Sequence, residues 1–198
     1  MERDYGVWKF SGKEKAKLIL SYLGLCGLVS WLFYHSFWVV LPFLAGLPVF
    51  LKKSREKRIK ERREELLTEF LTGIRAIASA LDAGYSMENA LGEALKETEK
   101  VYGMDGVFTE ELREMERKRN LNQSMETLWA DLGKRSGLED IENFGEIFQV
   151  ARRSGGNLKE IIQSTADNIT RKTETRREIE ISLAAKKMEQ KVMSFLGM

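Results

Sequence analysis

The sequence predicts an all-α protein, in which an N-terminal transmembrane helical hairpin is followed by a cytoplasmic helical bundle of about six helices. Residues 18–51 form a run of 34 positions with no Lys, Arg, Asp or Glu. From residue 64 onward, apolar residues recur at steps of three and four, which is the period of an amphipathic helix, and no stretch alternates as a strand would. No proline occurs after Pro48 to break these helices.

The apolar run 18–51 is too long for one membrane span and predicts two. A spanning helix needs roughly 20 apolar residues, and one helix of the whole run would be about 50 Å long against a hydrocarbon core of roughly 30 Å. We place the turn at 34–36, a Tyr-His-Ser sequence that is the most polar point of the run. Trp31 and Trp38 lie near this turn, as aromatic residues do at a membrane interface.

Basic residues on both sides of the run predict the orientation of the hairpin. Four lysines precede the run within residues 9–17, and a strongly basic stretch follows it. Because cytoplasmic flanks carry the excess of Lys and Arg, both ends are expected in the cytoplasm. The expected organisation is a cytoplasmic N-terminal segment 1–17, the hairpin 18–51, a basic juxtamembrane linker 52–63, the cytoplasmic bundle 64–190, and the start of a further membrane segment at 191–198.

The positive charge of the chain is concentrated in the linker. Residues 52–63 hold eight basic and two acidic side chains, whereas the stretch from residue 64 to the end carries a net charge of −6, which argues against nucleic acid as a partner. Anionic lipid headgroups are the natural counter-charge beside an apolar run. The residues expected to contact the membrane surface are Lys52, Lys53, Arg55, Lys57, Arg58, Lys60, Arg62 and Arg63. Two alternatives are a pure topology signal and a contact with a protein partner.

Three predicted helix starts in the bundle look alike: AGYSMENAL, LNQSMETLW and SGGNLKEII. Each has a short polar side chain where an N-cap is needed, and Ser-Met-Glu occurs twice, 38 residues apart. Capping chemistry explains the likeness, and a remnant internal repeat is the alternative. The expected turn residues are Gly84, Ser86, Gly155, Gly156 and Asn157. The expected inward positions are Met87, Leu91, Ala94, Leu95, Thr98, Met125, Leu128, Trp129, Leu132, Ile141, Phe144, Ile147, Phe148 and Ala151.

The stretch ARRSGGNLKEII at 151–162 predicts a joint between two helices, and a phosphate-binding loop is the alternative. It has neither the GxxxxGK[ST] spacing nor the GxGxxG spacing of phosphate-binding loops, and no strand precedes it. Two arginines suit the negative end of a helix dipole, and Asn157 with Glu160 forms a capping box at the start of the next helix. That last helix is expected to run to about Gln190 and to be charged on nearly every face after Ile169.

The sequence offers no catalytic residues, no cofactor site and no metal site, so we expect a protein that is not an enzyme. The only histidine is His35 in the apolar run, which we interpret as a turn residue rather than a proton relay or metal ligand. The only cysteine, Cys26, is expected to be a small apolar packing residue. An acidic cluster at 139–142 suits a helix N-terminus, and a divalent cation is the alternative.

The order AGYSMENAL, then SMETLWADLGKRSGLEDIENFGEIFQVARRSGGNLKEIIQSTADNIT, resembles the type II secretion system F domain. More narrowly, it resembles the platform membrane proteins of tight-adherence (Tad, or Flp) pilus machinery. The resemblance covers roughly residues 64–185 and is most specific from Phe144 to Leu158. Members of that subfamily continue into further membrane spans, whereas this sequence ends at KVMSFLGM, so it is either truncated or without a C-terminal anchor.

The resemblance implies an inner-membrane, multi-pass platform protein with a cytoplasmic helical bundle and no catalytic residues. The implied partners are a hexameric secretion ATPase, a pilin or pseudopilin, and a paralogous platform protein, in a homo- or hetero-oligomer. A membrane-tethered signalling or receptor module is the alternative, although such modules usually have uninterrupted heptads, a nucleotide pocket or a phosphoacceptor histidine. We also hypothesise that residues 170–190 lead back to the membrane and contribute to self-association.

Overall fold

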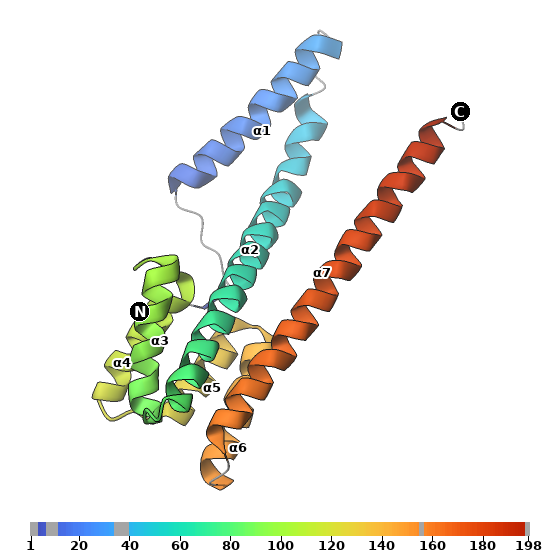
Figure 1. Cartoon of the computed structure of the whole chain (residues 1–198). Coiled ribbons are helices and arrows are strands. Elements are labelled where there is room, and N and C mark those ends of the chain that lie inside the picture. Colours follow the sequence, from blue (N-terminus) through green and yellow to red (C-terminus); the bar gives the residue numbers. More distant parts are fainter. Residues whose placement is uncertain (1–3, 7–11, 34–39, 155–156, 197–198) are drawn as a thin grey trace. The chain divides into compact units, whose positions relative to one another are not determined.

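The structure, a computed structural model, describes residues 4–6, 12–33, 40–154 and 157–196. These residues form seven α-helices and no strand, which confirms the all-α prediction (Figure 1). The helices are α1 (Gly12–Phe33), α2 (Val40–Asp82), α3 (Met87–Tyr102), α4 (Val107–Asn120), α5 (Met125–Ser136), α6 (Glu139–Ser154) and α7 (Leu158–Leu196). The chain divides into an N-terminal unit, Met1–Glu65 with Arg135–Gly137, and a bundle unit, Leu66–Lys134 with Leu138–Met198.

In the N-terminal unit, the predicted hairpin turn at 34–36, including His35, lies outside the described residues. Within the described ranges, none of the helices combines the length and the apolar character that crossing a bilayer requires. The predicted linker 52–63 is not a separate segment, because it is helical and continuous with α2. No Gly or Pro interrupts residues 49–72, and pairs one turn apart, Lys57–Glu61 at 3.7 Å and Lys60–Glu64 at 3.5 Å, favour the helix.

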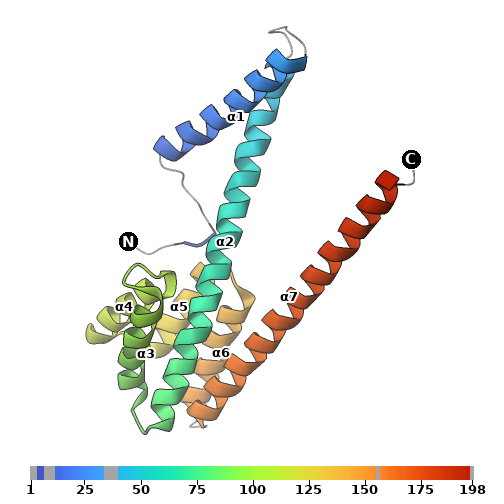
Figure 2. The same ribbon diagram turned by 45° about the horizontal axis from the view of Figure 1, so that its top comes forward.

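In the bundle unit, α3 to α6 lie beside the C-terminal part of α2 and the N-terminal part of α7 (Figure 1). Successive helices alternate in direction, so the turns from α2 to α3, from α4 to α5 and from α6 to α7 come to the same end of the bundle (Figure 2). We call this end the capped end. The helix α7 continues past α3 to α6, as the long charged helix of the sequence predicts.

Five aromatic side chains from four helices form the centre of the bundle core. Phe70 of α2 contacts Phe144 of α6 and Phe108 of α4 edge to face, with ring centroids 5.3 and 5.4 Å apart. Trp129 of α5 lies 4.9 Å from Phe144, and Phe148 completes the group. Edge-to-face aromatic pairs stabilise a core beyond the area that they bury.

The start of α4 is capped by a residue from another helix. Gly106 precedes α4 and offers no side-chain cap. The carboxylate of Glu69, a residue of α2 that is only 2% exposed, accepts hydrogen bonds from the backbone N–H groups of Val107 at 3.1 Å and Phe108 at 2.8 Å. Helix N-termini carry unpaired N–H groups and a partial positive charge, which compensates for burial of the carboxylate.

Helices α5 and α6 approach each other closely at two glycines. A Cβ atom on Gly133 would lie 2.8 Å from the Cα atom of Glu142, and a Cβ atom on Gly145 would lie 3.1 Å from the carbonyl oxygen of Trp129. Both neighbours are backbone atoms, which cannot turn aside as a side chain can. The contact therefore sets the distance between α5 and α6.

The inward faces predicted for α3 and α5 are buried in full, and the face predicted for α6 is buried with one exception. Ile147 was expected inward but is 40% exposed, so that prediction was wrong. It immediately precedes the buried Phe148, and one residue corresponds to about 100° around a helix. Its three-residue spacing from Phe144 carries it beyond the edge of the buried face.

We expect the substitution Gly133→Ala to lower the free energy of unfolding by about 1–3 kcal/mol, because α5 and α6 must separate to admit the methyl group. Thermal unfolding of the full chain in mild detergent, followed by circular dichroism, measures the change. The control is Gly92→Ala on α3, where the new methyl group meets only the carboxylate end of Glu116. There we expect no loss, and a gain of up to about 1 kcal/mol from helix propensity. Equal losses in both variants would contradict the close-approach explanation.

Candidate interaction surfaces

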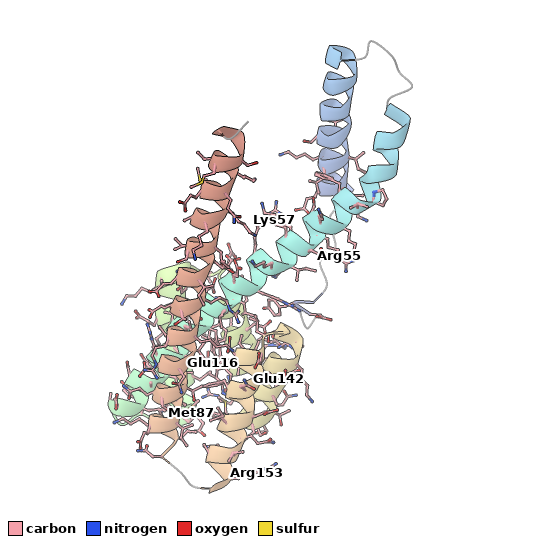
Figure 3. The ribbon with its side chains drawn as sticks, turned by 90° about the vertical axis from the view of Figure 1, so that its right-hand side faces the viewer. Arg55, Lys57, Met87, Glu116, Glu142 and Arg153 are labelled. Carbon is pink, nitrogen blue, oxygen red and sulfur yellow. The ribbon has the colours of Figure 1, made fainter. Side chains whose placement is uncertain are left out.

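The basic segment 52–63 of α2 exposes most of its charge. Six of its eight basic side chains are exposed, and Arg55 and Lys57 project from α2 in Figure 3. The six are Lys52, Lys53, Arg55, Lys57, Arg58 and Lys60. The ion pairs of this stretch with Glu61 and Glu64 lie on exposed side chains at 3.5–3.8 Å, a type of contact that leaves a charge available to a partner.

The other two basic residues of the segment make contacts within the N-terminal unit. The guanidinium of Arg62 lies 5.4 Å from the ring centre of Tyr5, which is a cation–π geometry. The guanidinium of Arg63 occupies the space where a Cβ atom on Gly137 would be, and Gly137 also has a φ of 61°. Both half-buried arginines are therefore committed to packing, a difference within the segment that the sequence pattern did not indicate.

At the capped end of the bundle, the three similar helix starts share a similar capping geometry. Ser86 Oγ accepts from the N–H of Asn89 at 3.3 Å, Ser124 Oγ accepts from Thr127 at 3.3 Å, and Asn157 Oδ1 accepts from Glu160 at 3.5 Å. Gly84 has a φ of 88°, the left-handed conformation that ends α2. Gly155 and Gly156, the other predicted turn residues, lie outside the described part of the chain.

Arg152, at the C-terminal end of α6, connects two of these helix starts. Its Nε lies 3.1 Å from a carboxylate oxygen of Glu126 in α5, and an Nη lies 3.5 Å from a carboxylate oxygen of Glu88 in α3. The two glutamates are the last residues of the two Ser-Met-Glu sequences. Arg119, at the end of α4, donates to the backbone carbonyl of Glu88. The ends of four helices are therefore joined around Arg152.

The environment of these two glutamates stabilises their charged form. A hydrogen bond from the backbone N–H at the helix start is the main cause that lowers the pKa of Glu88, followed by the Ser86 hydroxyl and Arg152, and burial opposes it. The pKa of Glu126 is lowered in the same way, first by the backbone N–H and then by Arg152 and Ser124. Sequence reasoning missed this cluster, although the repeated Ser-Met-Glu was a signal that the two helix starts are equivalent.

The base of α7 is tied to its neighbours by charged and polar contacts. Lys159 pairs with Asp82 at the end of α2, and Arg75 of α2 donates to the hydroxyl of Thr170 at 2.8 Å. Lys172 lies 2.7 Å from Asp140 in the acidic cluster at the start of α6. The ammonium group of Lys172 thus lies against the acidic cluster 139–142, for which a divalent cation was the alternative interpretation. Among the described residues, no group of three or more His, Cys, Asp or Glu side chains is arranged to hold a metal ion.

An open groove of about 520 Å³ lies between α2 and α3. It is lined by side chains of α2, by Tyr85 in the turn that follows α2, and by two glutamates of α3. The lining residues are Thr72, Arg75, Ala76, Ser79, Ala80, Tyr85, Glu93 and Glu97.

Residues 74–197 match the family model of the type II secretion system (T2SS), protein F. The chain belongs to the T2SS protein F family. The match begins within α2 and includes all three capped helix starts and Arg152, whereas the basic segment 52–63 and the apolar run precede it. The comparison with curated proteins found no match, and neither did the comparison with solved structures.

T2SS protein F family members are non-enzymatic platform proteins of the inner membrane. They work in secretion and pilus assembly machinery and generally interact with a secretion ATPase and with pilins. A protein that works by binding other components of a machine needs exposed surfaces for contact, and the exposed basic segment 52–63 is one such surface.

We expect the substitution Arg152→Gln to lower the stability of the bundle by on the order of 1 kcal/mol at neutral pH, since both partners are partly exposed to screening solvent. Because the pKa values of Glu88 and Glu126 are lowered from 4.5, their contribution is present above this value and is lost as the pH falls through the lowered values. The difference between the native chain and the variant should therefore shrink as the pH falls below 4.5. Urea unfolding across this pH range measures the difference.

The control for this prediction is the neighbouring, exposed Arg153→Gln, which should follow the native chain at every pH (Figure 3). A loss of stability in the Arg152 variant that did not change with pH would show that packing of the arginine, rather than its two carboxylate partners, carries the effect.

Proposed function

We propose that this T2SS F family protein is an inner-membrane platform protein of a tight-adherence (Tad/Flp) pilus assembly machine, in which it couples a cytoplasmic secretion ATPase to pilin assembly. The observation that carries the proposal is the family match over residues 74–197. The narrower assignment is supported by the sequence resemblance from Phe144 to Leu158. The bundle would transmit force through its aromatic core, where α2, α4, α5 and α6 meet.

In this proposal the run 18–51 forms a two-span hairpin with both ends in the cytoplasm, so that the main domain is cytoplasmic. Its 34 residues without Lys, Arg, Asp or Glu support the hairpin, and the lysines before it and the basic segment after it support the orientation. The platform would assemble as an oligomer with further copies or with a paralogous platform protein.

The six exposed basic residues of 52–63 would contact anionic lipid, at about 1 kcal/mol for each basic residue near the surface. Arg62 and Arg63 would instead maintain the fold, because Arg62 packs on the ring of Tyr5 and Arg63 packs against Gly137. The segment would thus hold the start of the bundle near the membrane while its last turn stays packed.

Co-purification tests the coupling to an ATPase. We expect the full chain, extracted in mild detergent, to form a stable complex of several copies with a cognate secretion ATPase, as measured by mass photometry. A monomer that ignores the ATPase at concentrations well above a micromolar affinity would contradict the proposal and favour a signalling module. The control is an ATPase from an unrelated secretion machine, which should not bind.

Hydrogen exchange tests the lipid contact. In nanodiscs with anionic lipid, we expect the backbone amides of 52–63 to exchange more slowly than in nanodiscs with neutral lipid. The difference should vanish in about 1 M salt, where the Debye length is about 3 Å. The matched control is 110–119 of α4, which is helical and charged, and whose exchange should not depend on the lipid. An equal lipid effect on both segments would mean that 52–63 has no specific role at the surface.

A further inference from the structure

The outward side of α6 carries exposed aliphatic side chains beside exposed carboxylates. Ile147 is 40% exposed and Val150 is 66% exposed. Glu142 and Glu146 are exposed as well. Steps of four residues join Glu142, Glu146 and Val150, and Ile147 precedes Val150 by three residues, so all four lie on the same side of the helix. We call these four residues the outer face of α6.

The outer face lies opposite the side of α6 that packs into the bundle core. Ile141, Phe144 and Phe148 are each at most 1% exposed, and the two phenylalanines contact Trp129 of α5. Most of Val150, by contrast, remains open to solvent. Packing of the bundle therefore does not explain an aliphatic side chain at this position.

The two carboxylates of the outer face are not used within the bundle. The neighbouring Asp140 pairs with Lys172, and Arg152 pairs with glutamates of α3 and α5. Glu142 and Glu146 form no ion pair with any residue that the structure describes. A partner that covers the aliphatic side chains takes these carboxylates out of water, and burial of an unpaired charge is costly. The partner therefore has to supply positive charge.

This requirement separates the candidate occupants of the outer face. An anionic lipid surface has the same sign of charge as the two carboxylates and would be repelled. A second copy of the chain that presented the same face would set carboxylates against carboxylates, which also costs free energy. A basic protein segment suits both parts of the face, because Lys and Arg pack their aliphatic stems on apolar surface while their charged ends reach carboxylates.

We propose that the outer face of α6 is the docking surface for a basic segment of the secretion ATPase. In this contact, Lys or Arg side chains pair with Glu142 and Glu146, and aliphatic groups cover Ile147 and Val150. Members of the T2SS protein F family generally interact with a secretion ATPase. The inference rests on the proposed coupling to this ATPase, and it adds the surface and the charge of the partner.

The position of the outer face suits a contact that bears force. Phe144, on the opposite side of the same helix, contacts Phe70 of α2 and Trp129 of α5. At the C-terminal end of α6, Arg152 pairs with carboxylates of α3 and α5. A push on α6 would therefore reach α2, α3 and α5 through direct side-chain contacts, without passing through a loop.

The size and charge of the face predict a salt-sensitive contact. From Glu142 to Val150 the helix is about 12 Å long at 1.5 Å per residue, whereas a stable interface usually buries about 800 Å² on each partner. The outer face thus supplies only part of an interface, in which attraction between charges has a large share. Because salt screens such attraction, we expect the affinity for the ATPase to fall as the ionic strength rises.

Charge reversal tests the surface. The full chain in mild detergent carries Glu142→Lys together with Glu146→Lys, and its affinity for a cognate secretion ATPase is measured by biolayer interferometry. We expect the affinity to fall on the order of tenfold, because like charges would then meet across the contact. The matched control is Glu174→Lys with Glu178→Lys, an exposed pair at the same spacing on α7. It changes the net charge equally and should leave the affinity unchanged.

Thermal unfolding of each variant shows whether the fold is kept. Glu142 lies in the first turn of α6, where a carboxylate suits the helix dipole, so a lysine there can weaken the helix itself. Substitution of both glutamates by Gln keeps the shape of the side chains and removes their charge. This Gln variant replaces the reversal if the reversal lowers the unfolding temperature, and it should also bind more weakly than the native chain.

Three outcomes would overturn the surface. If the native chain binds the ATPase and the outer-face variant binds equally well, the coupling stands and the surface is wrong. If the outer-face variant and the α7 control lose affinity equally, the net charge of the chain governs binding rather than this face. If the native chain does not bind the ATPase, the proposed coupling is wrong and the surface is overturned with it.

An aliphatic substitution supplies a second readout. Val150→Ser should weaken binding several-fold by removing apolar contact, while the salt dependence stays that of the native chain because no charge changes. The control is Val101→Ser at the end of α3, where the valine is 55% exposed, and this variant should bind as the native chain does. An unchanged affinity in Val150→Ser would show that the carboxylates act alone, and it would overturn the docking surface as proposed.

Discussion

The bundle depends on the close approach of α5 and α6, whose backbones touch at Gly133 and Gly145. This contact brings Trp129 against Phe144 and Phe148, and Trp129 in turn lies beside Phe70 and Phe108. A wider spacing would leave a gap that no rotamer of these large rings fills, because protein interiors are close-packed. The close approach at Gly133 and Gly145 thus places the ring of Trp129. This ring in turn positions α2 through Phe70 and α4 through Phe108.

Local chemistry made much of this fold predictable from sequence. The buried faces of α3 and α5 follow from three- and four-residue steps, and Ser86 and Ser124 cap helices because a short oxygen-bearing side chain reaches nearby N–H groups. Features that depend on distant residues were not predictable. The sequence indicates neither that Glu69 would cap α4, 38 residues away, nor that Arg152 would meet both Ser-Met-Glu glutamates. Ile147 was misplaced because periodicity defines a face only to within about one residue.

The capped end shows how one short motif can be used twice. Alternation of helix direction brings the starts of α3, α5 and α7 to the same end of the bundle (Figure 2). The carboxylates of Glu88 and Glu126 in the first turns of α3 and α5 meet the guanidinium of Arg152 from the end of α6, a placement that suits the dipoles of all three helices. The likeness of the sequences AGYSMENAL and LNQSMETLW is thus more than local capping, because both helix starts share one arginine.

The cap that Glu69 of α2 places on the start of α4 makes the two ends of α4 unequal in their resistance to local unfolding. Its first N–H groups are fixed to a buried carboxylate of α2, whereas its C-terminal end passes into the exposed Leu121 and into Asn122, whose φ is 64°. Helices usually fray from both ends. In α4, fraying at the N-terminal end would leave a carboxylate buried without partners, whereas fraying at the C-terminal end would break the contact of Arg119 with the backbone carbonyl of Glu88, which stays accessible to water. We therefore expect the N-terminal end of α4 to open last.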